Sequence, residues 1–159
     1  MILRKDIGGS VITLDDAKAY LGFVGRDDRD AEIQTALNAA LLIVEERQDV
    51  SLRPMTVELP TTGSGWKRLY LLPVVEVLSV KDARSGKDLE YSLAYDKRSI
   101  LVKASQSYVV EYSTEPINEH MMDVFRTGVL AVASLIFDGS TDAASYRQVF
   151  NAMMIPSNL

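Results

Sequence analysis

His120 is the single histidine of the sequence and the first residue to consider for catalysis or metal binding. It lies in the run Asn-Glu-His-Met-Met, one residue before an apolar position of a predicted helix. No second histidine is available to share a metal ion, and the H-E-x-x-H spacing of zinc hydrolases is missing. We therefore interpret His120 as a surface or interface residue and predict no metal site around it.

Two pairs of neighbouring aspartates are the next candidates, at positions 15–16 and 27–28. Clustered carboxylates attract hard cations. Each pair, however, stands where a helix is predicted to begin, and negative charge there complements the exposed backbone N–H groups. Adjacent residues on a helix also point about 100° apart. We interpret both pairs as helix-capping residues, with Asp28 or Asp30 capping the second helix.

The segment Gly-Ser-Gly-Trp-Lys at residues 63–67 has the small residues of a phosphate-binding loop. It lacks the P-loop spacing and the strand–loop–helix order that a P-loop requires. We interpret the segment as the tip of a hairpin. Its single tryptophan, Trp66, suits an interface anchor, because the indole ring contributes a large contact area at a small entropy cost.

The tyrosines of residues 107–113 alternate with apolar residues, a pattern that a base-stacking sheet would also show. Base stacking in proteins is accompanied by basic residues, whereas this chain has a net charge of −5. We therefore expect these tyrosines to pack within a sheet. An acidic protein does not grip DNA, but its charge is compatible with the wall of a channel through which DNA slides.

Composition narrows the class of protein further. The 159 residues suit a single domain, and the absence of cysteine excludes disulfides and thiolate chemistry. Residues 1–10 contain no apolar run long enough for a secretion signal, so we expect none, and we expect no membrane-spanning segment. With no convergent reactive groups, the sequence predicts a structural or binding protein that is not an enzyme and needs no cofactor.

Helices are predicted at both ends of the chain. Thr13 begins the first one with a shortened capping box completed by Asp16, and an apolar stripe from residue 33 to residue 44 marks the second. A long third helix is expected from Pro116 to Phe137. A fourth follows, with Ser140 or Thr141 as its cap, and ends at Pro156.

The middle of the chain reads as strands, because short β-prone runs are separated by proline and glycine from residue 55 to residue 113. Residues 99–103 and 108–112 are predicted to form one of its hairpins. We expect an antiparallel meander. The whole is an α+β fold: a helical body of two N-terminal and two C-terminal helices with an inserted β lobe at residues 54–113, forming one domain over residues 1–159.

The order of these segments resembles the phage head-tail connector family, also called adaptor or head-completion proteins. Residues 12–21 (ITLDDAKAYL), the acidic loop after them and the helix at 33–46 are similar to the way in which members open. Residues 71–80 (LLPVVEVLSV) resemble the strand pair of members with a β insert. Residues 109–113, leading into Pro116, resemble the family's strand before its long helix.

The resemblance implies a virion structural protein at the head-tail interface, made in the host cytoplasm. Such a subunit docks in a ring under the portal protein, commonly in twelve copies, and joins the portal to a stopper or tail-completion protein. DNA passes through the ring without specific binding, and no membrane is involved. An alternative from another class is a small non-enzymatic module that binds proteins through the β lobe.

Residue type and position suggest five interface candidates. Trp66 stands at the predicted hairpin tip, and Arg126 on the long helix. Tyr146, Arg147 and Phe150 belong to the last helix. Aromatic residues and arginine are enriched at interfaces. Phe150 is a core residue if its replacement by alanine destabilises the monomer, and an interface residue if the replacement abolishes only assembly.

Overall fold

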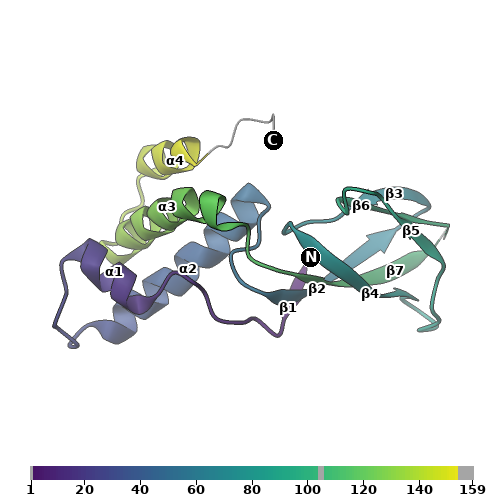
Figure 1. Cartoon of the computed structure of the whole chain (residues 1–159), viewed down its shortest axis with the longest axis horizontal. Coiled ribbons are helices and arrows are strands. Elements are labelled where there is room, and N and C mark those ends of the chain that lie inside the picture. The colour runs from purple at the N-terminus through teal and green to yellow at the C-terminus, as the bar shows by residue number, and fades with distance from the viewer. Residues whose placement is uncertain (1, 104–105, 154–159) are drawn as a thin grey trace. The chain divides into compact units, whose positions relative to one another are not determined.

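A computed structural model describes residues 2–103 and 106–153 and confirms the α+β class (Figure 1). In chain order, two helices precede most of the strands and two helices follow them. Its strands are antiparallel and form two sheets. The helices are α1 Leu14–Leu21, α2 Asp30–Gln48, α3 Glu119–Phe137 and α4 Ala143–Ala152. The strands are β1 Leu3–Lys5, β2 Met55–Thr62, β3 Gly65–Arg68, β4 Val74–Asp82, β5 Tyr91–Leu93, β6 Ser99–Val102 and β7 Ser107–Thr114.

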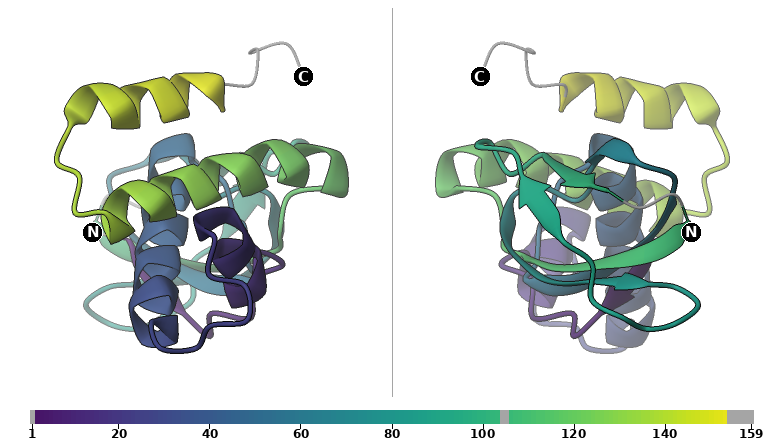
Figure 2. Two further views of the ribbon diagram at one scale, coloured as in Figure 1. Left: turned by 90° about the vertical axis from the view of Figure 1, so that its left-hand side faces the viewer. Right: turned by 90° about the vertical axis from the view of Figure 1, so that its right-hand side faces the viewer.

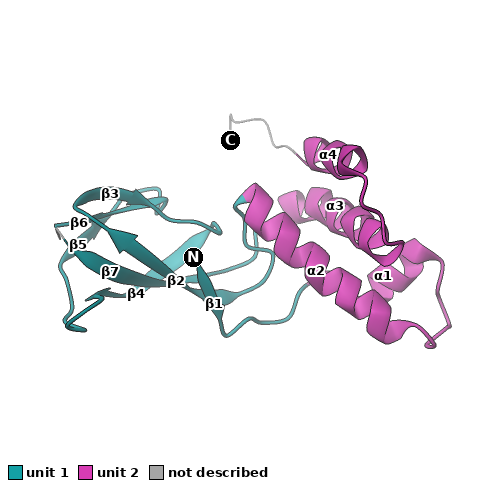
Figure 3. Ribbon diagram, turned by 180° about the vertical axis from the view of Figure 1, so that it is seen from behind, with its two compact units in different colours: residues 1–10, 49–117 teal, residues 11–48, 118–159 magenta. Residues whose placement is uncertain are grey.

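The chain divides into two compact units (Figure 3). The β unit comprises residues 1–10 and 49–117, and the helical unit comprises residues 11–48 and 118–159. The chain therefore passes between the units three times, near residues 10, 48 and 117. The prediction of a single domain over the whole chain stays a prediction.

Helix α1 begins as the sequence predicts. The Asp16 N–H donates to the Thr13 hydroxyl at 3.2 Å, and the Thr13 N–H donates to the Asp16 carboxylate at 2.7 Å. This reciprocal capping box satisfies two backbone donors that the first turn leaves free. The helix ends at Gly22, whose φ of 76° lies in the left-handed region that glycine adopts without strain.

Helix α2 begins differently from the prediction. Neither Asp28 nor Asp30 is its cap: the Asp28 carboxylate pairs with Arg26 at 3.1 Å, and Asp30 lies 2.8 Å from the Lys18 ammonium. Both carboxylates thus have basic partners on nearby segments. A basic side chain and the free backbone N–H groups of a helix compete for the same carboxylate oxygen atoms. The sequence pattern alone does not show whether such an aspartate caps the helix or forms an ion pair.

Helices α2 and α3 pack against each other and form the centre of the helical unit. Their facing positions recur every three or four residues, as an amphipathic pair requires. Helix α3 begins at Glu119 rather than at Pro116, because the Asn118 side chain accepts the Met121 N–H and caps it. The buried residues of the pair are Ile33, Ala36, Leu37, Ala40, Leu41 and Val44 on α2, and Met122, Phe125, Val129, Val132 and Ala133 on α3.

Helix α3 departs from the expectation that no segment approaches a membrane span. It has 19 residues and a mean hydropathy of 1.4, which is long and apolar enough to cross a membrane by length and composition alone. The core helix of a soluble protein meets the same criteria. Here the apolar residues include the α3 side chains that pack against α2, which accounts for its composition.

Helix α4 lies alongside α3 (Figure 2). Its cap is Asp142, whose carboxylate accepts the N–H groups of Ala144 and Ser145; the predicted caps Ser140 and Thr141 precede it. Contact between the helices is close at Gly128 of α3, where a Cβ atom would stand 1.8 Å from the sulfur of Met153. The predicted end of this helix at Pro156 lies outside the described residues.

The strands form a four-stranded sheet in the order β1-β2-β7-β4 and a three-stranded sheet in the order β3-β6-β5. This order differs from that of a meander, because β2 pairs with β7 along its whole length, from Met55 opposite Thr114 to Thr62 opposite Ser107. The predicted hairpin of residues 99–103 and 108–112 is wrong, since β6 and β7 belong to different sheets. The sequence pattern did not predict strand β1, which lies before α1 in the chain.

The core of the β unit follows the two-residue period of its strands. On β7 the side chains of Tyr108, Val110, Tyr112 and Thr114 are buried, while those between them are partly exposed. Residues from both sheets complete one cluster, which packs the two sheets together. Its other members are Met55, Val57, Leu59, Leu69, Leu71, Val74, Val80, Ile100 and Val102.

We predict that Gly128→Ala weakens the packing of α4 on α3. The added methyl group overlaps the Met153 side chain, and overpacking of this kind costs about 1–3 kcal/mol of unfolding free energy. Hydrogen exchange of residues 143–153 should become faster. The double variant Gly128→Ala/Met153→Ala relieves the overlap, so exchange that stays equally fast in the double variant would contradict this account.

Candidate interaction surfaces

No catalytic centre emerges from the residues that sequence reasoning singled out. His120 is exposed on the first turn of α3, as expected for a surface residue. In the described part of the chain, no group of three or more histidine, cysteine, aspartate or glutamate residues is placed to hold a metal ion. The functional candidates are therefore surfaces.

The tyrosines of β7 pack within the sheet, as predicted. Tyr108 and Tyr112 are 1% and 0% exposed, so their rings are not accessible to nucleic acid bases. The Tyr112 hydroxyl donates to the Tyr70 carbonyl at 2.9 Å and accepts the Tyr70 N–H at 3.2 Å. Burial raises the pKa of Tyr112, which keeps this hydroxyl a donor at physiological pH. The pair of bonds holds the segment after β3 against β7.

Trp66 lies within strand β3 opposite Leu101 of β6, and not at a hairpin tip. The tip prediction fails because residues 63–64 connect strands of two different sheets. The indole is 56% exposed, although tryptophan is among the largest apolar side chains. This exposure keeps Trp66 available as an anchor for a partner.

Arg126 of α3 is bound within its own chain. Its guanidinium donates to the Asp16 carboxylate at 2.8 Å and to the Val11 carbonyl at 3.4 Å. Partial burial raises the pKa of Asp16, but hydrogen bonds from Thr13 and the nearby Arg126 charge outweigh it and hold that pKa below its ordinary value. Arg126 therefore ties α3 to the start of α1.

The three candidates on α4 differ in exposure. Phe150 is 5% exposed, and the Arg47 guanidinium lies over its ring at 4.7 Å from the ring centre. Tyr146 is half-buried, with its hydroxyl donating to the Ser140 carbonyl at 3.4 Å. Arg147 is exposed. Of the three, Phe150 has the environment of a core residue, and Arg147 alone faces solvent.

An ion cluster joins α1 to the start of α2. The Lys18 ammonium lies 2.6 Å from Asp27 and 2.8 Å from Asp30, and these hydrogen bonds raise the pKa of Lys18 above its ordinary value. Beside the cluster, the ring centres of Phe23 and Phe137 are 5.5 Å apart, edge to face. The Arg29 guanidinium lies 4.2 Å from the centre of the Phe137 ring.

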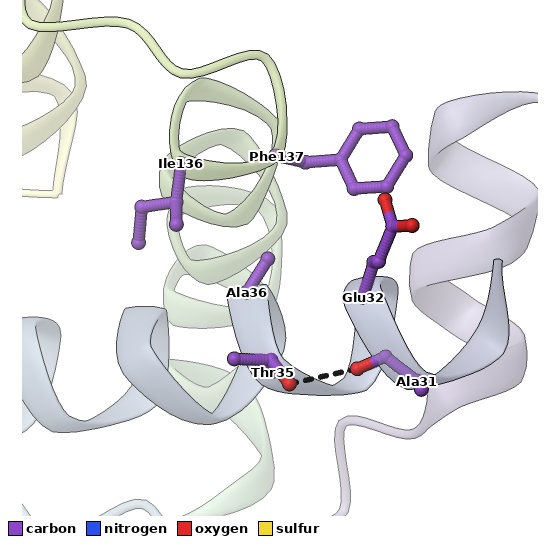
Figure 4. A pocket seen from close by; sticks show the side chains of 6 residues that line it. All are labelled: Ala31, Glu32, Thr35, Ala36, Ile136 and Phe137. Atoms are coloured by element: carbon purple, nitrogen blue, oxygen red, sulfur yellow. Dashed lines mark hydrogen bonds between the residues drawn. The ribbon is translucent and has the colours of Figure 1, made fainter.

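A hollow of about 400 Å³ lies between α2 and α3, at the N-terminal end of α2 and the C-terminal end of α3 (Figure 4). Sequence reasoning missed it, since residues about 100 positions apart form its walls. Among the described residues of its lining, Glu32 alone has a charged side chain. The lining residues are Ala31, Glu32, Thr35, Ala36, Ile136 and Phe137.

Charge is distributed unevenly between the two units. The helical unit has twelve aspartates and glutamates against six lysines and arginines, a net charge of −6. The β unit has eleven basic residues against ten acidic ones, a net charge of +1. The acidity of the chain therefore belongs to the helical unit.

We predict that Phe150→Ala destabilises the chain by about 3 kcal/mol, because it removes a buried ring that the surrounding helices cannot fully replace. Urea unfolding measures the change. Arg147→Ala, an exposed neighbour on the same helix, is the control and should leave the unfolding free energy within about 0.5 kcal/mol. An equal effect of both substitutions would contradict the core position of Phe150.

We predict that Asp16 contributes stability that is lost in acid. The folded chain lowers the pKa of Asp16 from its ordinary 3.8, so the unfolded chain binds this proton first. The contribution is complete above pH 3.8 and disappears as the pH falls through the lower, folded value. Urea unfolding of Asp16→Asn at a series of pH values should show a shallower acid loss than the wild type.

Asp15→Asn provides the control for the acid measurement, because the Asp15 side chain is exposed and makes no hydrogen bond or ion pair with the described residues. Its acid profile should follow that of the wild type. If Asp16→Asn also follows the wild-type profile, the bond network of Thr13, Asp16 and Arg126 does not stabilise the folded chain.

No family model and no curated protein sequence matches the chain. Among solved structures, it is similar to a chain in the neck of an empty gene transfer agent particle computed with C6 symmetry. The TM-score is 0.68 at 12% identity, covering 100% of this chain and 97% of that one. A chain in the native particle's neck, computed with C12 symmetry, gives 0.62 at 12% identity with the same coverage.

A chain from the virion of the native gene transfer agent particle also matches, with a TM-score of 0.67, 14% identity and the same coverage. The alignments extend over both units and over nearly the full length of those chains. At such low identity the likeness concerns the fold. This chain therefore shares the fold of chains found in the neck and virion of gene transfer agent particles.

Proposed function

We propose that the chain is a virion structural protein of the head-tail connector type. In this role it docks in a ring under the portal protein and joins the portal to a stopper or tail-completion protein. The observation that carries the proposal is the full-length fold similarity to chains in a particle neck. Fold alone does not specify function, but this similarity covers both units in their chain order.

The symmetry of the similar structures supports a ring. The necks were computed with C6 and C12 symmetry. A cyclic ring joins one surface of each subunit to a different surface of the next, and it closes after a fixed rotation. We propose twelve copies of this chain in such a ring, which leaves a central channel for DNA.

The surfaces of the chain suit a structural role. Reactive groups do not converge in the described residues, and several polar side chains serve as caps or ion pairs that connect elements. The net charge of −5 disfavours tight binding of phosphates. We therefore propose that DNA passes through the ring without specific binding, and that the protein has no enzymatic activity.

Electron microscopy of purified particles tests the proposal. We expect density for this chain in a twelve-fold ring between the portal and the tail, and mass spectrometry should find the chain in intact particles. Particles in which the ring is absent, or which lack the chain, would contradict the proposal. Capture of the chain by a non-virion protein through its β unit would favour the binding module instead.

The oligomeric state of the free chain gives a second prediction. We expect the purified protein to be a monomer, or weakly associated, at micromolar concentration. A subunit in a ring on the portal binds the portal and its neighbours together, whereas free subunits have only the contacts with one another. Sedimentation velocity measures this. A stable closed ring formed without portal would show that docking is not required for assembly.

A further inference from the structure

We propose that neighbouring copies in the ring meet through strand β3 of one copy and the α2–α3 hollow of the next, with Trp66 seated in the hollow. This contact rests on the proposed function, because it requires a ring. It goes beyond that function by naming the two surfaces. The occupant of the hollow is thus a second copy of this chain.

Opposite charge on the two units favours this pairing. The helical unit has a net charge of −6 and the β unit a net charge of +1. Contacts that join helical unit to helical unit would bring together two strongly acidic surfaces. Contacts that join a β unit to a helical unit avoid this repulsion, and complementary charge fixes which surfaces meet. A cyclic ring requires such a contact between unlike surfaces.

The hollow has the chemistry to receive an aromatic side chain. Ala31, Thr35 and Ala36 line the α2 side with small groups, and Ile136 and Phe137 line the α3 side (Figure 4). At about 400 Å³ it has room for an indole ring. The Glu32 side chain, 60% exposed, places a carboxylate at the same side as the Phe137 ring, where it accepts the Arg29 Nε–H at 3.0 Å.

Strand β3 presents a matching group. Trp66 is 56% exposed and stands beside Lys67 in the sequence. Lys67 makes no ion pair with the described carboxylates, whereas Arg68 is already paired with Asp49. A protruding indole with an ammonium beside it complements an apolar hollow with a carboxylate at its edge. Trp66 and Lys67 are available on every copy, whereas the Glu32 carboxylate would be shared between Arg29 of its own chain and the incoming Lys67.

The absence of cysteine from the chain allows a direct test in purified particles. The double variant Glu32→Cys/Lys67→Cys should form disulfides between adjacent copies, because a disulfide requires Cα atoms within about 7 Å. A head-to-tail contact gives a ladder of covalent oligomers on non-reducing gels. Each single variant gives no ladder, because one cysteine joins two chains at most. Mass spectrometry then identifies the linked peptides.

The control pair is Glu32→Cys/Arg84→Cys. Arg84 is an exposed basic residue of the same unit, but it lies in the turn after β4, a strand of the other sheet. We expect a ladder with the first pair and none with the control. Particles that contain the chain in a ring without any ladder, or with equal ladders, would overturn the contact and leave the connector role standing. Particles without the chain would overturn both.

A second experiment fills the hollow with a bulky side chain and measures assembly. Thr35→Phe places a ring where Trp66 would enter and should lower the copies of the chain per particle by about tenfold or more, as loss of a central anchor does. Thr127→Phe is its matched control. Both threonines are exposed on helices, and each hydroxyl donates to the carbonyl four residues earlier. Equal incorporation of the two variants would overturn the contact.

The anchor itself is tested by Trp66→Ala against Tyr95→Ala, an aromatic residue that is 106% exposed on the β5–β6 turn. Tyr95→Ala should leave the folding equilibrium within about twofold. Trp66→Ala also removes the buried part of the ring, so urea unfolding must first show that the variant is folded at the assembly temperature. Only Trp66→Ala should reduce incorporation. A covalent product that joins position 32 to another virion protein would place that protein in the hollow instead.

Discussion

The pairing of β2 with β7 is the constraint on which both units depend. These strands lie in register from Met55 opposite Thr114 to Thr62 opposite Ser107, although Met55 and Thr114 are 59 positions apart in the sequence. Strand β2 follows α2, and β7 precedes α3. The ladder therefore brings together the two points at which the chain leaves and re-enters the helical unit. Side chains reinforce it there, since the Ser51 and Thr114 hydroxyls lie 2.9 Å apart.

Polar groups in this chain serve mainly to hold elements together. Lys18 pairs with Asp27 and Asp30 between α1 and the start of α2, and Arg126 joins α3 to Asp16. In these pairs each charged group already has a partner within the chain. Two accessible features of the described residues are largely apolar, the exposed Trp66 and the hollow between α2 and α3. This division suits a protein that works by contact with neighbours.

Local chemistry made several elements predictable. The capping box of Thr13 and Asp16 acts within one turn, so its residues are neighbours in the sequence and their roles can be read there. The buried stripe of α2 and the alternation of β7 follow from the periods of a helix and a strand. Predictions failed where the same residue type suits two roles. Asp28 and Asp30 could either cap α2 or form ion pairs, and in the structure both pair with basic side chains.

The sequence by itself determined the α+β class, the placing of two helices before and two after the strand-rich middle, the start of α1 and the burial of the β7 tyrosines, because each depends on contacts within a few residues or on a regular period. Only the tertiary structure decided the division into two sheets, the position of Trp66 within β3, and the hollow between α2 and α3. These features join residues 30 to 100 positions apart, and strand pairing over such distances is set by the packing of the whole core, which no local pattern encodes.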